Sequence, residues 1–455
     1  MRPTLSKQSD MFAPSVDHEL ARELRETDEV IAAHPEWVRL VHADLTKKLN
    51  VDARAGRTGM PAAQVLRAGL LLRRLGMSLR ALAPLLEDSL SLREFLGLGP
   101  ADRCPKRSAL QDNIAKIRPE TWGKLMQGLS RSDEAMEHES GEQVRVDATV
   151  TATPIHQPSD SSLLWDCVRV LTRLMTSALQ ELGVDFEDHS REAKKLHHRI
   201  FYARTAAQRA PAYAALLEAA ERVKAQSEAV LATIRKLNPS TWEAECAKNA
   251  LAPELERVGG LFVRVISQTR RRVLQGETVP AHEKVFSIFE EHTDIIVKNG
   301  NRSPEYGHKI TLTVGKSGMV LDCVIERGNP GDVTLATRQL ERQKKLFGQV
   351  PAVAAFDGGY ASKENLDEAK KLGVERCAFS KGRGLTAEDM AGSRRTYGRL
   401  RDFRAGIEGV ISNLKRSFGL DRCTWKGWER FKAYIWSGIF AANLTALARA
   451  RRCGA

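Results

Sequence analysis

Strand-like patterning occurs in two blocks of the chain that a long helical stretch separates. Residues 143–151 (QVRVDATVT) alternate apolar and polar side chains, which is the period of a β-strand. Residues 309–314 (KITLTV) and 319–325 (MVLDCVI) flank a glycine-containing turn and predict a β-hairpin. Residues 350–356 (VPAVAAF) and 375–379 (ERCAF) predict two further short strands. The sequence therefore predicts a mixed sheet with helices packed on it and a long helical insertion after its first strand, an α/β fold class.

The rest of the chain has helical periodicity. Residues 61–75 predict one helix, and Ser78 is the expected N-cap of a second helix after a turn at Gly76. This pair is compatible with a DNA-binding helix-turn-helix and with any helical hairpin. In the middle of the chain, apolar residues at steps of three and four predict further helices over 164–182, 191–206, 211–237 and 253–274. A long helix is expected at about 401–418.

The charge of the chain points to a polyanionic partner. There are 70 Lys and Arg residues against 57 Asp and Glu residues, a formal net charge of +13. Nucleic acid is the commonest partner of so basic a chain, although a protein that is merely basic is the alternative. The seven cysteines are scattered without a C-x-x-C pair, which disfavours a disulfide framework and a zinc ribbon. We expect a cytoplasmic protein with no signal peptide and no membrane span.

Three acidic residues occupy positions that suggest chemistry. Asp147 lies within a mostly apolar strand, where a carboxylate is costly to desolvate without a partner. Asp357 follows a buried strand and precedes two glycines, which let a ligand approach the backbone. Glu408 lies off the apolar stripe of the late helix and shares a face with Arg404 and Lys415. Each also has a structural interpretation: a cross-strand partner of a lysine, a turn former and a helical ion pair, respectively.

Together, three carboxylates on three elements of a basic chain suggest a site for divalent cations. Mg²⁺ and Mn²⁺ prefer carboxylate and water oxygens and need no cluster of Cys or His. Two such ions can activate a nucleophile and stabilise the leaving oxygen of a phosphodiester. From the residues alone, this set is a suggestion and no more.

Several segments resemble those of insertion-sequence DDE transposases. The first-aspartate region of that family is similar to VDATVTATPIHQPSDSSLLWD at 146–166, and its second-aspartate region to AFDGGYAS at 355–362. Its third-acid helix is similar to RAGIEGVISNLKRSFGL at 404–420, including Arg-x3-Glu-x6-Lys. The N-terminal helical domain of the family is similar to GRTGMPAAQVLRA and SLRALAPLLEDSLSLREFLGL. The resemblance covers most of the chain except about 185–280.

The resemblance implies a ribonuclease-H-like catalytic core with Asp147, Asp357 and Glu408 as the metal-binding and catalytic triad. It transfers contacts with DNA phosphate to Arg404 and Lys415. The family often has a tyrosine three positions before that arginine; here Arg401 stands there, which puts a role for that tyrosine in doubt. The implied domains are an N-terminal helical DNA-binding or dimerisation domain (1–135), a catalytic domain (140–160 and 285–455) and a helical insertion (161–284).

The implied activity is metal-dependent cleavage at the ends of an insertion sequence, followed by strand transfer by transesterification. The expected cofactors are two Mg²⁺ or Mn²⁺ ions, and the expected partner is double-stranded DNA, namely the terminal inverted repeats and the target. A homodimer is expected when two ends are synapsed. A nuclease without strand transfer and a non-catalytic DNA-binding regulator are the alternatives. Cations and an aromatic side chain near the C-terminus complete the predicted DNA-binding residues: Arg401, Arg404, Lys415, Arg416, Lys426 and Trp425.

Overall fold

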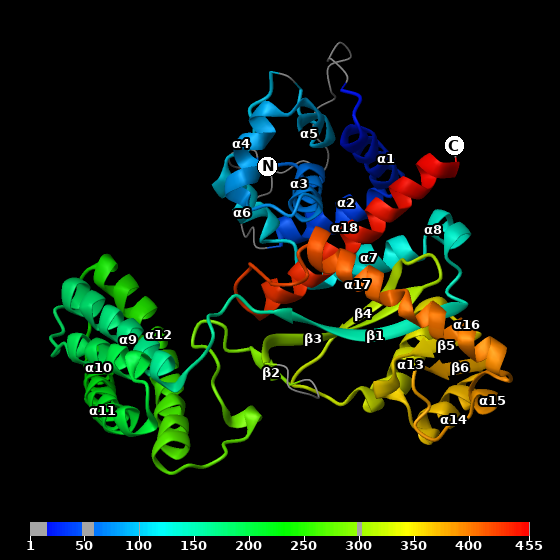
Figure 1. Ribbon diagram of the computed structural model, residues 1–455. Coiled ribbons are helices and arrows are strands. Elements are labelled where there is room, and N and C mark those ends of the chain that lie inside the picture. The colour runs from blue at the N-terminus through cyan, green and yellow to red at the C-terminus, as the bar shows by residue number, and fades with distance from the viewer. Residues whose placement is uncertain (1–15, 48–58, 100, 298–302, 455) are drawn as a thin grey trace. The chain divides into compact units, whose positions relative to one another are not determined.

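The computed structural model describes residues 16–47, 59–99, 101–297 and 303–454 (Figure 1). The chain divides into two compact units, residues 1–154 with 307–455, and residues 155–306. The start of the chain, on which the prediction of no signal peptide depends, lies outside the described residues. Within the described ranges, no helix is both long enough and apolar enough to cross a membrane.

The first unit begins with helices that follow the predicted pattern. Ser78 caps its helix as expected, since its side chain accepts a hydrogen bond from the backbone N–H of Ala81. The N-terminal helices are α1 (Glu19–Ala33), α2 (Pro35–Thr46), α3 (Ala62–Arg74), α4 (Leu79–Asp88), α5 (Leu90–Phe95), α6 (Arg107–Ile114), α7 (Pro119–Ser130) and α8 (Asp133–His138).

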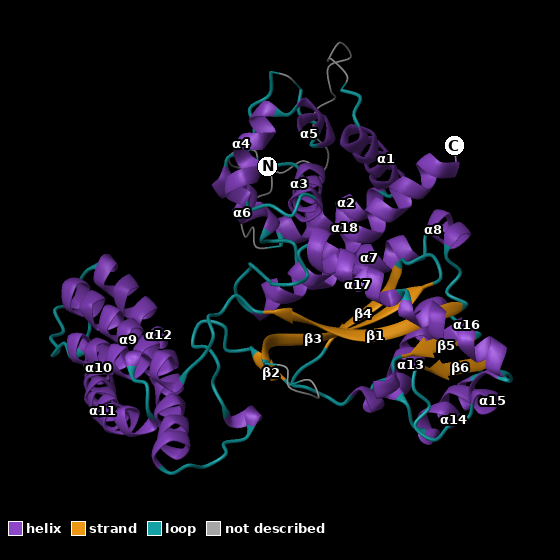
Figure 2. Ribbon diagram, viewed as in Figure 1, coloured by secondary structure: helices purple, strands orange, loops and turns teal. Residues whose placement is uncertain are grey.

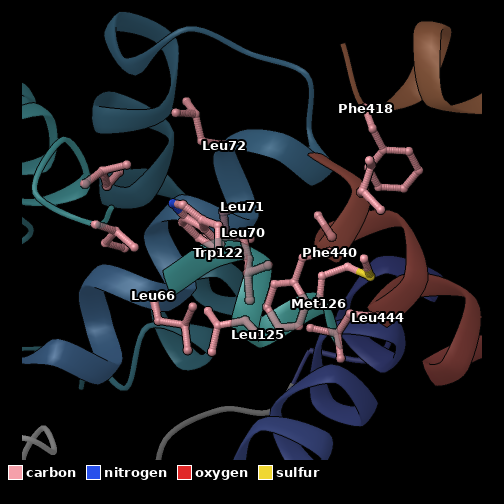
Figure 3. Close-up of a cluster of buried hydrophobic side chains, with 14 of the residues drawn as sticks. Leu66, Leu70, Leu71, Leu72, Trp122, Leu125, Met126, Phe418, Phe440 and Leu444 are labelled. Atoms are coloured by element: carbon pink, nitrogen blue, oxygen red, sulfur yellow. The ribbon is translucent and has the colours of Figure 1, made fainter. Parts of the chain in front are cut away.

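A large apolar core joins helices α1 to α7 to the last helix of the chain, α18 (Trp428–Gly454). Trp122 on α7 and Phe440 on α18 are fully buried, with ring centroids 6.2 Å apart. Figure 3 shows them packed among leucines of α3 and α7. Helices from both ends of the chain therefore share one core, which burial of large apolar side chains stabilises.

The predicted mixed sheet is confirmed (Figure 2). In the first unit its strand order is β4-β3-β1-β5-β6, with β1 antiparallel to β3 and parallel to β5. Strand β4 is antiparallel to β3, and β6 is parallel to β5. The strands are β1 (Gln143–Ala152), β3 (Glu305–Gly315), β4 (Val320–Ile325), β5 (Val353–Phe356) and β6 (Arg376–Phe379).

Apolar cores cover both faces of this sheet. Ile310, Leu312 and Val314 belong to the core of the N-terminal helices and α18, whereas Val144 and Val146 belong to a second core. The second core includes residues of α13 and α14, so the sheet is a layer between helices. The helices after the hairpin are α13 (Ala336–Phe347), α14 (Lys363–Leu372), α15 (Ala387–Ala391), α16 (Arg394–Ala405) and α17 (Ile407–Ser417), with short 3₁₀ turns at Asp332–Thr334 and Gly358–Tyr360.

The prediction of one long helix over 401–418 is wrong, because α16 and α17 meet at Gly406. Nη1 of Arg145, on β1, donates to the carbonyl oxygen of Phe403 at 3.0 Å. In a continuous helix that oxygen would accept from residue 407. A Cβ at Gly406 would also collide with the Arg145 guanidinium. The Arg145 side chain therefore fills the space beside Gly406 and donates to the carbonyl oxygen that a continuous helix would use.

The second unit is mainly helical. Its helices are α9 (Asp160–Leu182), α10 (Ser190–Tyr202), α11 (Ala206–Lys236) and α12 (Trp242–Thr269), followed by a π-helical turn (Arg270–Leu274), a 3₁₀ turn (Ala281–Glu283) and β2 (Asp294–Ile296). The four helices share their own apolar core. The predicted helix starts at Pro211 and Pro253 are wrong, since the side chains of Thr205 and Thr241 cap the two helices earlier.

Candidate active site

Strand register brings Asp147 and Asp357 together. Strands β1 and β5 are parallel, and Val146 lies opposite Phe356. Asp147 directly follows Val146 and Asp357 directly follows Phe356, so the two aspartates lie at the same level of neighbouring strands. The carboxyl ends of parallel strands are where open α/β sheets place their ligands.

The guanidinium of Arg404 joins all three predicted acids. Its Nη2 lies 2.6 Å from Oδ2 of Asp147 and 3.1 Å from Oδ1 of Asp357. Its Nη1 lies 3.0 Å from Oε1 of Glu408, across the junction of α16 and α17. The structure therefore gathers Asp147, Asp357 and Glu408 around one positive charge. We call these four residues the acidic centre.

Exposure increases across the acidic centre. The side chain of Asp147 is 17% exposed, that of Asp357 41% and that of Glu408 69%. Burial raises the pKa of Asp147 to about 6, although the positive charge of Arg404 opposes this shift. Burial would also raise the pKa of Asp357, but Arg404 and a hydrogen bond from Ser380 outweigh it, so the pKa lies below its ordinary value. Glu408 is the acid most open to solvent.

Sequence reasoning missed several groups around the acidic centre. Ser380 donates from its hydroxyl to Oδ1 of Asp357 at 3.0 Å. Asp332 lies close enough to raise the pKa of Asp147, and its carboxylate is 3.0 Å from Nζ of Lys309. The hydroxyl of the fully buried Tyr360 has no hydrogen-bond partner among the described residues. Ser380 directly follows strand β6 as Asp357 follows β5, a signal that could have identified it.

The acidic centre has the donor chemistry of a site for a hard divalent cation. Its three carboxylates come from three separate elements and already surround a cation, the guanidinium of Arg404. In the described part of the chain, no three acidic, Cys or His side chains form a ready-made metal cluster. The carboxylates of Asp147, Asp357 and Glu408 therefore offer the oxygen donors that a divalent ion requires, and the residues present fit that role.

Of the six predicted DNA-binding residues, Arg404 lies in the acidic centre, four line two separate cavities, and Arg401 stands alone. Lys415 and Arg416 line a surface cavity of about 490 Å³ together with Glu408. Trp425 and Lys426 line a different cavity of about 550 Å³. The side chain of Arg401 is 60% exposed and lines neither cavity.

Two further side chains, Tyr397 and His308, make structural contacts outside the acidic centre. Tyr397 on α16 donates from its hydroxyl to the carbonyl oxygen of Phe379 at 2.9 Å, which fixes α16 against β6. His308, a polar residue on β3, is completely buried, with its ring centroid 4.8 Å from that of Phe431. Both contacts are structural, and neither residue lies in the acidic centre.

Two families of known proteins match the chain. The family described as "Transposase DDE domain" matches residues 270–444, and the family described as "Transposase domain (DUF772)" matches residues 15–116. The first match includes Asp357 and Glu408 and begins after Asp147. No curated protein and no solved structure matches the chain. With its mixed sheet and ribonuclease-H-like core, the chain belongs to the DDE-type insertion-sequence transposases, a family of DNA-binding and DNA-modifying enzymes.

Proposed function

We propose that this chain cleaves DNA at the ends of an insertion sequence and joins those ends to target DNA, with Asp147, Asp357 and Glu408 as its catalytic acids. The observation that supports this most strongly is the parallel register of β1 and β5, which sets two aspartates side by side. The contacts of Arg404 with both aspartates and with Glu408 support the inclusion of the third acid.

The three acids would hold two Mg²⁺ or Mn²⁺ ions. Bound there, these ions would supply activation of a water molecule and stabilisation of the leaving oxygen. Asp147 and Asp357 are fixed by strands, whereas Glu408 is exposed at the start of α17 and can adjust its position. The lowered pKa of Asp357 keeps its carboxylate ionised at neutral pH.

The proposed reaction has two displacements at phosphorus. Water attacks the phosphodiester at the element end, and the bond to the 3′-oxygen breaks to leave a 3′-hydroxyl. That hydroxyl then attacks a target phosphodiester, forming one P–O bond while another breaks. Neither step needs a covalent protein–DNA intermediate, so the chain contributes positioning and charge stabilisation.

The surface beside Glu408 suits a DNA backbone. Lys415 and Arg416 line the cavity that Glu408 also lines, and cations at such a surface neutralise phosphates. Lys415 has a partner in Asp421, with Nζ and Oδ1 3.5 Å apart. We propose that DNA phosphates replace Asp421 as the partner of Lys415 and also contact Arg401, Arg404 and Arg416.

Cleavage and joining of DNA that carries the flanking terminal repeats tests this function. Asp147→Asn, Asp357→Asn and Glu408→Gln should each bind the repeats and neither cut nor join them, with Mg²⁺ or Mn²⁺ present. Asp367→Asn is the matched control, because Asp367 is an exposed acid on α14 and lies outside the acidic centre. Its cleavage rate should equal that of the unaltered protein.

The same assay separates the two alternatives. Nicked products that are never joined would indicate a nuclease without strand transfer. Binding of the repeats without cleavage, under every metal condition, would indicate a DNA-binding regulator. We further propose that two copies act together to synapse two ends, on DNA in the bacterial cytoplasm, with residues 1–135 as the DNA-binding or dimerisation domain, 140–160 and 285–455 as the catalytic domain and 161–284 as the insertion.

A further inference from the structure

A large cavity of the first unit is lined by none of the residues of the acidic centre. Its volume is about 550 Å³, within the range of small-molecule and nucleotide sites. One wall comes from α3, α4 and α6, and the other from residues 419–434, which comprise the segment after α17 and the first turns of α18. None of the described residues that line it is acidic, whereas three are cationic: Arg73, Lys426 and Arg430. We call it the basic pocket.

Arg73 is an unusual residue for the wall of such a pocket, because it is buried and carries a charge. It is 4% exposed, and its guanidinium lies 3.6 Å from the centroid of the Tyr434 ring. It donates from Nη2 to the carbonyl oxygen of Phe418, and its Nε has no hydrogen-bond partner among the described residues. No described carboxylate forms an ion pair with it. A buried guanidinium without an anion is costly, so this pocket favours an anionic ligand.

The remaining polar and aromatic groups suit a nucleotide. Trp425 is half-buried, and its ring packs edge-on against Tyr434 with centroids 5.5 Å apart. Lys426 and Arg430 are both exposed and both line the pocket. Cations bind a phosphate, and a partly exposed tryptophan can stack on a base whose faces are free.

We propose that the basic pocket binds an unpaired nucleotide of the DNA substrate, with its phosphate on Arg73, Lys426 and Arg430 and its base against Trp425. The base must be unpaired, because in a duplex its faces are covered by neighbouring bases. This deepens and rests on the proposed function, since it identifies a second contact with the same DNA. A free mononucleotide also presents a phosphate and a base. The experiment therefore distinguishes a free nucleotide from a nucleotide of DNA.

The test measures binding of a fluorescently labelled single-stranded oligonucleotide and of the matching blunt duplex to the full chain, by anisotropy, in EDTA. Because no cleavage is measured, its failure is distinguishable from failure of the proposed reaction. Trp425→Ala should weaken single-strand binding on the order of ten-fold, as loss of one stacked base does. Lys426→Ala should reduce the slope of log affinity against log salt by about one.

The controls are Trp242→Ala and Lys345→Ala, which alter an exposed tryptophan and an exposed lysine outside the basic pocket. Both should bind the single strand as the unaltered protein does. Because Lys426 is exposed, its variant should fold normally, which a thermal melt would verify. Single-strand affinity that neither pocket variant changes would overturn the proposal.

Competition with thymidine monophosphate separates the two sources. We expect the mononucleotide to compete only weakly, because it lacks the neighbouring phosphates that a strand presents. If it binds as tightly as the oligonucleotide and the affinity depends on Trp425, the pocket takes free nucleotides, which overturns the assignment to the DNA substrate.

Discussion

Two charge clusters of the molecule differ in their ratio of acidic to basic side chains: the acidic centre has more acids, and the cluster around Glu23 has more arginines. At the acidic centre, three carboxylates share the single guanidinium of Arg404. Glu23, on α1, is one buried carboxylate shared by two guanidinium groups. It accepts at 3.0 Å from Nη2 of Arg74 on α3 and at 3.0 Å from Nε of Arg449 on α18.

The difference separates a structural cluster from a candidate catalytic one. Burial opposes ionisation of Glu23, but its two arginines outweigh this and hold its pKa below the ordinary value. Glu23 is therefore satisfied, and it ties together helices from the two ends of the chain. The acidic centre has more acid than base and opens toward solvent at Glu408, so a further cation would stabilise it.

The largest expected effect is on chemistry at the acidic centre. Asp357→Asn should lower the cleavage rate by more than about 100-fold, because a metal ligand matters more than the outer-shell groups whose loss costs 10–100-fold. Its melting temperature should fall only slightly, since the lowered pKa of Asp357 indicates a stabilising carboxylate but its side chain is 41% exposed. Single-turnover cleavage and a thermal melt measure the two quantities. A marked loss of stability with cleavage retained would reverse the assignment of the two clusters.

Substitution of Glu23 should have the opposite pattern. Glu23→Gln leaves two arginines without their buried carboxylate and should lower the free energy of unfolding by about 3 kcal/mol. Cleavage per folded molecule should be unchanged, because Glu23 lies outside the acidic centre. Denaturant unfolding measures the loss, with Glu29→Gln as the control, since the Glu29 side chain is 68% exposed. Equal losses in the two variants would contradict a special role for Glu23.

The two clusters should also respond differently to pH. Asp147 must lose its proton to bind a cation, and its pKa is raised to about 6. Stabilisation of the protein by Mg²⁺ should therefore be present above pH 6 and be lost as the pH falls through 6. The contribution of Glu23, whose pKa is lowered, is present above its ordinary value of 4.5 and is lost only at lower pH.

Melting temperatures with and without Mg²⁺, measured from pH 5 to pH 8, test this. The increase caused by Mg²⁺ should be smaller at pH 5 than at pH 8, and Asp147→Asn should remove most of that difference. An increase that is independent of pH in the unaltered protein would contradict the raised pKa of Asp147.

The smallest effect is expected for an exposed pair that belongs to neither cluster. Arg222 on α11 donates to Glu192 on α10 at 2.6 Å, and both side chains are about half exposed. Arg222→Ala should change the free energy of unfolding by less than about 1 kcal/mol, because water screens exposed ion pairs. Denaturant unfolding checks this. A loss as large as that of Glu23→Gln would show that burial does not explain the difference between clusters.

Much of the fold follows from local patterns. Alternation over 143–151 predicted β1, helical periodicity predicted α3 and α9, and Ser78 predicted the start of α4. Such patterns depend on neighbours three or four positions away, or on the next residue but one. The prediction of one long helix over 401–418 is wrong because Arg145, distant in sequence, donates to the carbonyl oxygen of Phe403 at the break.

The sequence by itself determined which acids to consider, since each stands where a carboxylate is costly or accessible: within a strand, after a strand, or off an apolar stripe. Only the tertiary structure decided that they meet. The parallel register of β1 and β5 aligns Asp147 with Asp357, and the packing of α16 near these strands lets Arg404 contact both while it contacts Glu408. Tertiary contacts also decided that Arg73 is a buried cation without an acid. Register and burial depend on residues far apart in the chain, which no local period encodes.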